Sequence, residues 1–211
     1  MAKKGSYGIK EVADVTFYKV DKNNYVTGAT YNDSGVLTIA WKQTNAPEEK
    51  YKFDSLKVSN IEVASEETSA RGGKGNPELI SWSYGKTATL TVTDALISMA
   101  TMDLMFGAKE EATDAANVLT IDANSFPEPY QIVGTTVMRS YDTGEDVPFV
   151  FYIPKAQVQV GGTLTMEAEG DPSTFEMTIK ALSQDLYENS TDAAPAEKDV
   201  LVRFIRATKS N

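Results

Sequence analysis

The sequence predicts a mainly β protein, an antiparallel β-sandwich or barrel with one packed α-helix. Short runs of alternating or β-branched residues recur along most of the chain, as they do in sandwiches and barrels. One segment, residues 94–106, has the apolar density and end signals of a helix. The chain has 211 residues and 41% hydrophobic content, enough for one substantial core. We therefore expect a single domain over residues 1–211, with mobile termini.

Strands are expected first in the N-terminal part of the chain. Asn32-Asp33-Ser34-Gly35 has the chemistry of a tight turn, which predicts a hairpin with Tyr31 and Val36 at the strand ends. The predicted strands here are 12–20, 28–31, 36–42, 50–54, 58–64, 79–84 and 87–93.

Between two of these strands lies the most unusual local composition of the chain. Residues 71–77 contain three glycines, two cations and a proline, a mixture that does not support regular structure. We expect a long flexible loop near residues 65–78. Such a loop is either an ordinary exposed connection or a contact with a neighbouring subunit.

The predicted helix, Asp94 to Phe106, has marked ends, because Thr93 or Asp94 can cap its first turn and Gly107 follows its last. Its polar residues form only a narrow stripe, so most of its circumference should be buried. Residues 109–116 are a predicted polar connection. Further strands are expected at 118–121, 130–139, 158–160 and 200–207.

The most informative stretch begins with Val147 to Ile153, which is apolar on both faces and therefore must be covered on both sides. Gly161-Gly162 then leads into a predicted hairpin. Leu164, Met166 and Ala168 alternate with polar residues, residues 170–173 form a turn, and the return strand alternates as well. One face of this hairpin is apolar and the other is rich in threonine and glutamate.

This pattern resembles the C-terminal half of phage tail tube (major tail) proteins, and with the helix the resemblance covers residues 61–182. It implies a structural virion protein whose copies close into hexameric rings by sheet extension, stack into a tube and conduct DNA during ejection without binding it specifically. Partners would be further copies of the chain and, beyond them, tape measure, sheath and baseplate proteins. The protein would be assembled in the host bacterial cytoplasm and would lie in the tail of the virion, not in a membrane.

The resemblance also assigns roles to residues of this chain. The cationic loop would stack one ring on the next, and the polar face of the hairpin would line the lumen. The expected inter-ring loop is Arg71, Gly72, Gly73, Lys74, Gly75 and Asn76. The expected lumen residues are Thr163, Thr165, Glu167, Glu169, Thr174, Glu176 and Thr178.

Composition narrows the function classes independently. The net charge is −10, which disfavours a general nucleic-acid binder and suits either plain solubility or a surface that repels DNA phosphates. Cysteine and histidine are both absent, which removes thiolate nucleophiles, the commonest general base and the commonest zinc ligand. No apolar run predicts a secretion signal or a membrane span. We expect no enzyme activity, no cofactor and no metal.

Local motifs support no chemistry. Gly85-Lys86-Thr87 is similar to the end of a P-loop but lacks its leading glycine and precedes a strand. Residues 21–24 resemble the start of a calcium loop, yet the later glycine and glutamate positions do not match. Adjacent glutamates do not form the facing pair of a glycosidase, so a hydrolase would need carboxylates brought together across the fold.

Two alternative functions remain beside the tail tube. The first keeps the fold but forms a single ring in a baseplate or at the tail terminus. The second is a carbohydrate- or receptor-binding module in which exposed aromatic rings stack on sugars. Its candidate residues are Trp41, Trp82 and Tyr84, for which packing in a core or an interface is the favoured explanation.

Overall fold

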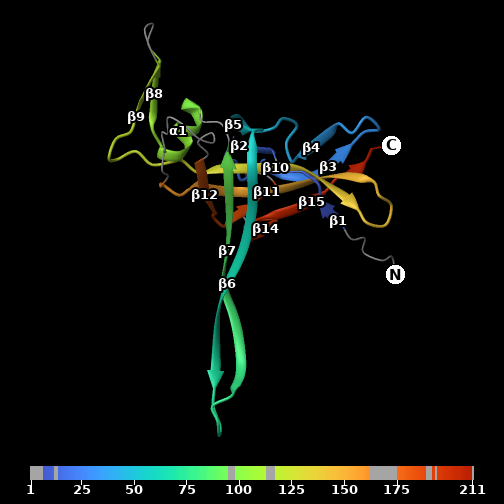
Figure 1. Ribbon diagram of the computed structural model, residues 1–211, viewed down its shortest axis with the longest axis vertical. Coiled ribbons are helices and arrows are strands. Elements are labelled where there is room, and N and C mark those ends of the chain that lie inside the picture. The colour runs from blue at the N-terminus through green and yellow to red at the C-terminus, as the bar shows by residue number, and fades with distance from the viewer. Residues whose placement is uncertain are drawn as a thin grey trace, which may run out of the picture.

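The structure is a computed structural model that describes residues 7–11, 14–94, 98–112, 117–161, 175–188, 192 and 194–210 (Figure 1). A nine-stranded sheet forms the body. Its strands run in the order β5-β2-β10-β11-β12-β7-β6, while β1 pairs with β10 and β15 pairs with β11. These strands are β1 (Tyr7–Ile9), β2 (Asp14–Lys19), β5 (Glu49–Phe53), β6 (Leu56–Arg71), β7 (Glu78–Asp94), β10 (Tyr130–Ser140), β11 (Asp146–Val158), β12 (Phe175–Ala181) and β15 (Arg203–Arg206).

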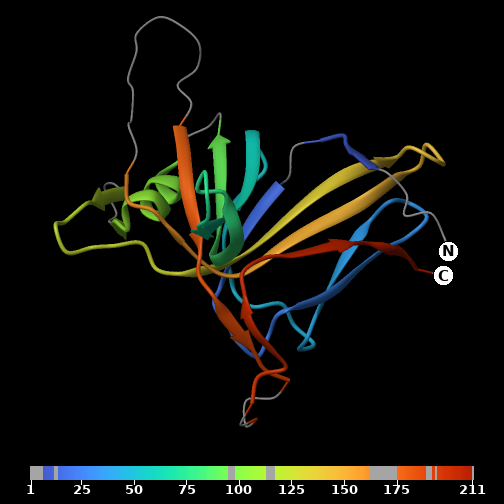
Figure 2. The same cartoon turned by 90° about the horizontal axis from the view of Figure 1, so that it is seen from below.

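Three smaller sheets complete the described fold, and the hairpin of β3 and β4 lies alongside β10 and β11 (Figure 2). All described strand pairs are antiparallel except β16 with β3. The smaller sheets consist of β3 (Val26–Tyr31), β4 (Leu37–Trp41) and β16 (Thr208–Lys209), of β13 (Gln184–Leu186) and β14 (Glu197–Val200), and of β8 (Lys109–Ala112) and β9 (Asn117–Thr120). The predicted mainly β, antiparallel fold is confirmed.

Strand β11 separates two hydrophobic cores. Val150 and Tyr152 pack into one cluster with residues of β3, whereas Phe151 and Ile153 pack into the other with residues of β2, β7 and β12. All four side chains are buried, because successive side chains of a strand point to opposite faces and both faces are covered here. The prediction that the run from Val147 to Ile153 is covered on both sides is therefore confirmed for residues 150–153, whereas residues 147–149 are only partly buried.

A buried polar pair fixes the register of the central strands. The Tyr152 hydroxyl donates to Gln131 Oε1 at 2.7 Å, and Gln131 Nε2 donates to the carbonyl of Lys19 at 2.7 Å. Burial raises the pKa of the Tyr152 hydroxyl well above its ordinary value. Because Gln131 is fully buried, a shift of either strand would leave its amide without partners, which is costly in a core.

The helix is shorter than predicted. Helix α1 spans Met99–Phe106 and is capped by Ser98, whose Oγ accepts from the Thr101 amide at 3.1 Å. Asp94 instead ends strand β7, opposite Leu56 and Phe175, so neither it nor Thr93 is the cap. Gly107 ends the helix in the left-handed conformation, as expected. Leu104 and Met105 enter the core, and Thr101 of the predicted polar stripe is buried as well. Ala100 is exposed and Met99, Met102 and Phe106 are only partly buried, so the apolar part of the helix is less buried than predicted.

Several strand boundaries also differ from the predictions. The predicted strands 79–84 and 87–93 form the single strand β7, and β6 extends well beyond residue 64. Strand β11 ends at Val158, so only the first residue of the predicted strand 158–160 lies in a strand. Residues 109–112 of the expected polar connection form β8, while the expected strand 200–207 is interrupted between Val200 and Arg203. In β6 and β7, the pairing between the two strands overrides local composition.

One close approach in the sheet generates a stability prediction. Gly134 lies opposite Phe151, and a Cβ at Gly134 would come within 2.0 Å of the Phe151 ring. We expect Gly134→Ala to lower the free energy of unfolding by about 1–3 kcal/mol, because the ring must leave its rotamer. The control is Gly28→Ala, since a Cβ at Gly28 in β3 meets nothing within 4 Å. Equal melting temperatures for the two variants would contradict the prediction.

Candidate assembly surfaces

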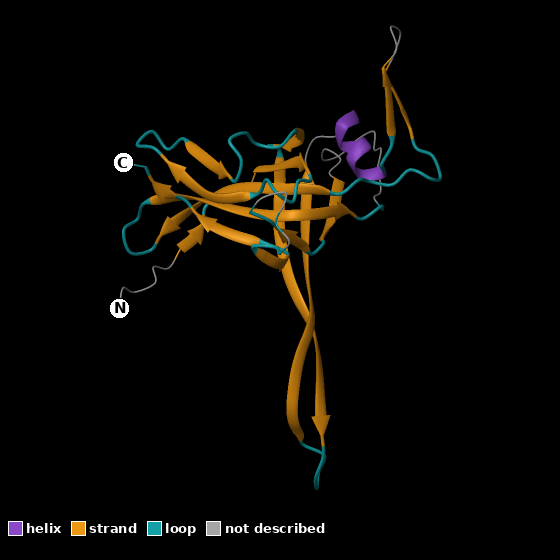
Figure 3. Ribbon diagram, turned by 180° about the vertical axis from the view of Figure 1, so that it is seen from behind, coloured by secondary structure: helices purple, strands orange, loops and turns teal. Residues whose placement is uncertain are grey.

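A two-stranded arm projects far from the body (Figures 1 and 3). It is the outer part of the β6–β7 hairpin, residues 62–87, whose strands pair from Leu56 opposite Asp94 to Arg71 opposite Glu78. Leu90 and Val92 anchor β7 in the core. Beyond them nearly every residue from 62 to 87 is exposed. The arm is therefore a ribbon that the described part of its own chain does not cover.

The predicted inter-ring residues lie at the far end of this arm. Residues 72–77 make the turn, in which the Gly72 amide donates to Pro77 and the Asn76 amide donates to Gly73, both at 3.1 Å. Gly73, Gly75 and Asn76 have positive φ, which explains the glycines at positions 73 and 75. Arg71 ends β6, so the connection is shorter than the expected loop at 65–78. Its flanks pair as strands instead, with Thr68 opposite Trp82 and Ala70 opposite Ile80.

One face of the arm is apolar, and the other is mainly polar but includes the exposed Leu79. Ile80, Trp82 and Tyr84 lie on one face, with exposed fractions of 55%, 51% and 53%. Ser81 and Ser83 lie on the other, where the Ser81 hydroxyl donates to the carboxylate of Glu67. We call Ile80, Trp82 and Tyr84 the aromatic stripe. From sequence, Trp82 and Tyr84 were candidates for sugar binding, with packing in a core or an interface as the favoured explanation. The period-two alternation from Ile80 to Tyr84 was the signal that pointed to one common face.

The aromatic stripe needs a partner surface on physical grounds. A two-stranded ribbon is at best marginally stable in water, and large aromatic side chains that stay half exposed gain little from folding. A contiguous exposed apolar patch typically marks a protein interaction site. The arm therefore has the properties of an interaction element.

A polar face runs across β12, β7 and β6 in the body. Glu176 lies opposite Thr93 and Thr178 opposite Thr91, and the buried side chains Met177 and Ile179 point the other way. The predicted alternation of this return strand is thus confirmed. Thr163, Thr165, Glu167, Glu169 and Thr174 lie outside the described residues. The sequence analysis did not assign the neighbouring polar residues of this face, which are Asn60, Glu62, Thr89, Thr91, Thr93 and Lys180.

The body sheet ends in two strands that pair on one side only within the described residues. Strand β5 pairs with β2, and β6 pairs with β7. These outer edges present unpaired backbone donors and acceptors, which another chain can extend as a sheet.

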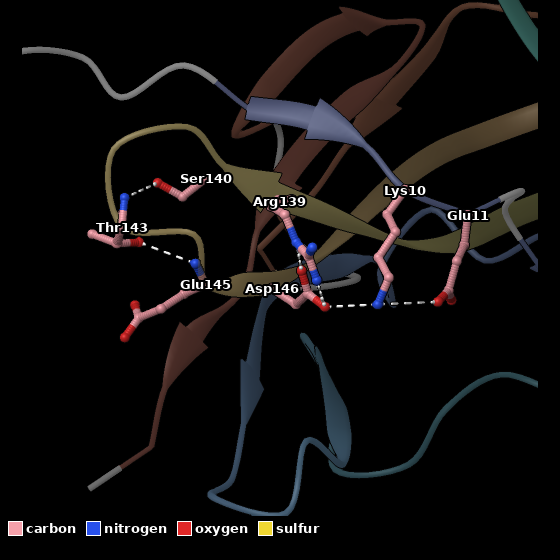
Figure 4. Close-up of polar contacts among 7 residues, drawn as sticks. All are labelled: Lys10, Glu11, Arg139, Ser140, Thr143, Glu145 and Asp146. Atoms are coloured by element: carbon pink, nitrogen blue, oxygen red, sulfur yellow. Dashed lines mark hydrogen bonds and ion pairs between the residues drawn. The ribbon is translucent and has the colours of Figure 1, made fainter.

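An ion cluster fixes the N-terminal strand to the end of the β10–β11 hairpin (Figure 4). Asp146 accepts from Arg139 Nε at 2.7 Å and from Lys10 Nζ at 2.7 Å. Hydrogen bonds from Arg139 and Lys10 hold the pKa of the Asp146 carboxyl well below its ordinary value. Lys10 directly follows β1, so this contact helps to keep the short strand paired with β10.

The aromatic residues proposed for sugar binding do not gather in one place. Trp41 packs edge-to-face on Tyr18 and Tyr152 beside the second core, with ring centroids 5.1 and 6.2 Å apart. Trp82 and Tyr84 lie on the arm. Within the described residues there is no acidic cluster suited to a metal ion and no helix with the length and apolarity to cross a membrane.

Comparison with protein families decides the relationship. The model of the YomU/Tube protein family matches residues 50–113 and 108–195. The chain belongs to this phage tail tube family. The matched region runs from β5 through the arm, the helix and the central strands to the segment before β14. No curated protein matches the sequence.

Membership in the tube family confirms the resemblance drawn from the hairpin and the helix. It indicates a tail tube protein, a structural component of the virion that assembles with itself. The exposed arm and the sheet edges that stay open in the described pairings are the surfaces on which such assembly can rest.

The Asp146 cluster generates a prediction about pH and salt. Because its folded pKa is depressed, Asp146 stabilises the fold above its unfolded pKa of about 4, and this contribution is lost as the pH falls through the folded pKa. We expect Asp146→Asn to speed amide exchange in Tyr7–Ile9 at neutral pH, and added salt to do the same in the wild type. Hydrogen exchange measures this. Asp142→Asn, in the adjoining turn, is the control, and equal exchange in both variants would contradict the role of the cluster.

Proposed function

We propose that this protein is the tail tube subunit, whose copies close into hexameric rings that stack into a hollow conduit for DNA ejection. The observation that carries the proposal is the exposed amphipathic arm on a protein of the tube family. Such an arm is costly for a monomer to leave in water. It is useful in a polymer, where each copy covers the arm of another.

Ring closure rests on the sheet edges in this proposal. The outer edges of β5 and β6 are open in the described pairings, and backbone pairing between copies would join successive sheets around the ring. Such pairing would also protect edges that otherwise invite aggregation. Stacking rests on the arm, whose tip residues Arg71 and Lys74 would reach the adjoining ring and meet its acidic surface.

The lumen is assigned to the polar face of β12, β7 and β6. Its side chains are mainly hydroxyls and carboxylates, and the whole chain carries a net charge of −10. A surface of this kind offers phosphates hydrogen-bonding groups but little cationic attraction, so DNA would slide along it without adhering. The tube would be assembled in the host cytoplasm around a tape measure protein, with sheath and baseplate proteins as further partners.

The stacking role predicts the effect of one charge on the arm. Trp82→Asp should leave the body folded, because Trp82 is half exposed, and should remove polymer. Losing one buried aromatic contact costs about 2 kcal/mol, which is about 30-fold in the association constant of each contact. Sedimentation of concentrated protein measures this. Ser83→Asp, on the opposite face of the same strand, should polymerise as the wild type does. If both variants pellet equally, the aromatic stripe is not the stacking surface.

The lumen assignment predicts that chemical labelling at position 176 of the tube depends on the size of the reagent. The Glu176→Cys variant has a single cysteine, because the natural chain has none. We expect this variant to react with a small maleimide both as monomer and as tube. A maleimide carrying a large polymer should label the monomer but not the tube, since it would be too wide for the bore. Mass spectrometry of the labelled protein reads both reactions. Rapid labelling of tubes by the large reagent would place this face on the outside.

A further inference from the structure

An apolar slot in the body lies between the edge of β6 and the strands β1, β11 and β15. It has a volume of about 550 Å³, and five consecutive residues, Lys57–Ile61, form one wall. Because successive side chains alternate, this wall includes the edge of the strand and not one face alone. Phe149 and Phe204 stack at the slot with ring centroids 6.0 Å apart. Ile9, Val58 and Phe204 remain 75%, 50% and 55% exposed.

We propose that the slot of one copy receives the aromatic stripe of a second copy. This inference rests on the proposed tube function and names the surface to which the arm binds. Both the stripe and the slot are exposed apolar surfaces of the described chain. Each can therefore cover the other when two copies meet. Docking would remove Trp82 and Tyr84 of one copy, together with Phe204 of the other, from water.

The occupant has to come from another molecule. The slot wall at Ser59 and the arm residue Thr68, opposite Trp82, lie on the same continuous strand β6. Nine residues of extended strand separate them by about 30 Å. The arm therefore cannot fold back into its own slot without breaking the ladder that pairs β6 with β7. A slot and an arm held apart in this way can be satisfied only between copies.

The chemistry of the two surfaces matches in three respects. The arm offers aromatic rings to the stacked Phe149 and Phe204, and aromatic pairs favour such contacts. Ile9 and Val58 at the slot, both at least half exposed, offer apolar surface to Ile80 of the arm. Lys57 at the slot can meet Glu66, which lies opposite Tyr84 on the arm.

The arrangement makes the assembly directional. A stripe and a slot on different parts of one molecule form a head-to-tail contact, which leaves a free slot at one end and a free arm at the other. Each added copy or ring therefore recreates the site for the next. This accounts for open-ended growth without a second kind of contact along the axis.

A mixing experiment tests the pairing. Trp82→Asp has a defective arm and an intact slot, whereas Phe204→Asp has a defective slot and an intact arm. Each variant alone should lose polymerisation, by tenfold or more in pelleted protein. An equal mixture should form one junction and no more. Analytical ultracentrifugation would detect it as a species with twice the mass of the particle that each variant forms alone. Ile9→Asp, at the exposed rim of the slot, serves as a second slot variant in case Phe204→Asp fails to fold.

Cysteine cross-linking tests the same contact in intact assemblies. With Thr68→Cys on the arm and Val58→Cys at the slot, oxidation should give a ladder of linked chains. The two positions within one chain are about 33 Å apart, too far for an intramolecular disulfide. The matched control, Ser69→Cys with Val58→Cys, places the arm cysteine on the opposite face and should give no ladder.

The possible failures are distinguishable. If Phe204→Asp and Ile9→Asp polymerise like the wild type while Trp82→Asp does not, the arm binds elsewhere; the slot inference is then overturned and the tube function is retained. If the folded wild type forms no polymer and Thr68→Cys with Val58→Cys gives no ladder, both are overturned.

Discussion

The rest of the structure depends on the burial of β11 on both of its faces. Val150 and Tyr152 serve one core and Phe151 and Ile153 the other, so a slip of one residue would exchange both sets of side chains. The hydrogen bond between Tyr152 and Gln131 adds a polar constraint on the same register. The central strands thus form a rigid wall against which the helix, the β3–β4 hairpin and the base of β7 pack.

That rigid wall is what allows an exposed arm. Leu90 and Val92 hold the inner part of β7 in the core, and the ladder with β6 continues outward without a core of its own. The same strand therefore changes from an internal element to an external one within a few residues. The inner part of β7 stabilises the body, whereas its outer part forms the exposed arm. The arm can therefore change its contacts in an assembly without loss of the fold.

Much of the fold could be predicted from the sequence where one local pattern decides the structure. The Asn32–Gly35 turn, the two-sided burial of Val150 to Ile153 and the alternation from Glu176 to Ala181 are all confirmed. The arm was missed because residues 65–71 have a polar composition typical of a loop, and only their pairing with 78–84 makes them a strand. The helix start was missed because Thr93, Asp94 and Ser98 are equally good caps by residue type, and the pairing of β7 removes the first two. The threonines of β7 could be assigned to the candidate lumen face only from the structure, in which β12 pairs with β7.

Electron microscopy of the purified, concentrated protein tests the central claim most directly. The exposed aromatic stripe, the open sheet edges and membership in the tube family together predict hollow tubes, or at least stacked rings, whose length increases with protein concentration. Compact monomeric particles at every concentration, from protein that melts cooperatively, would contradict the account.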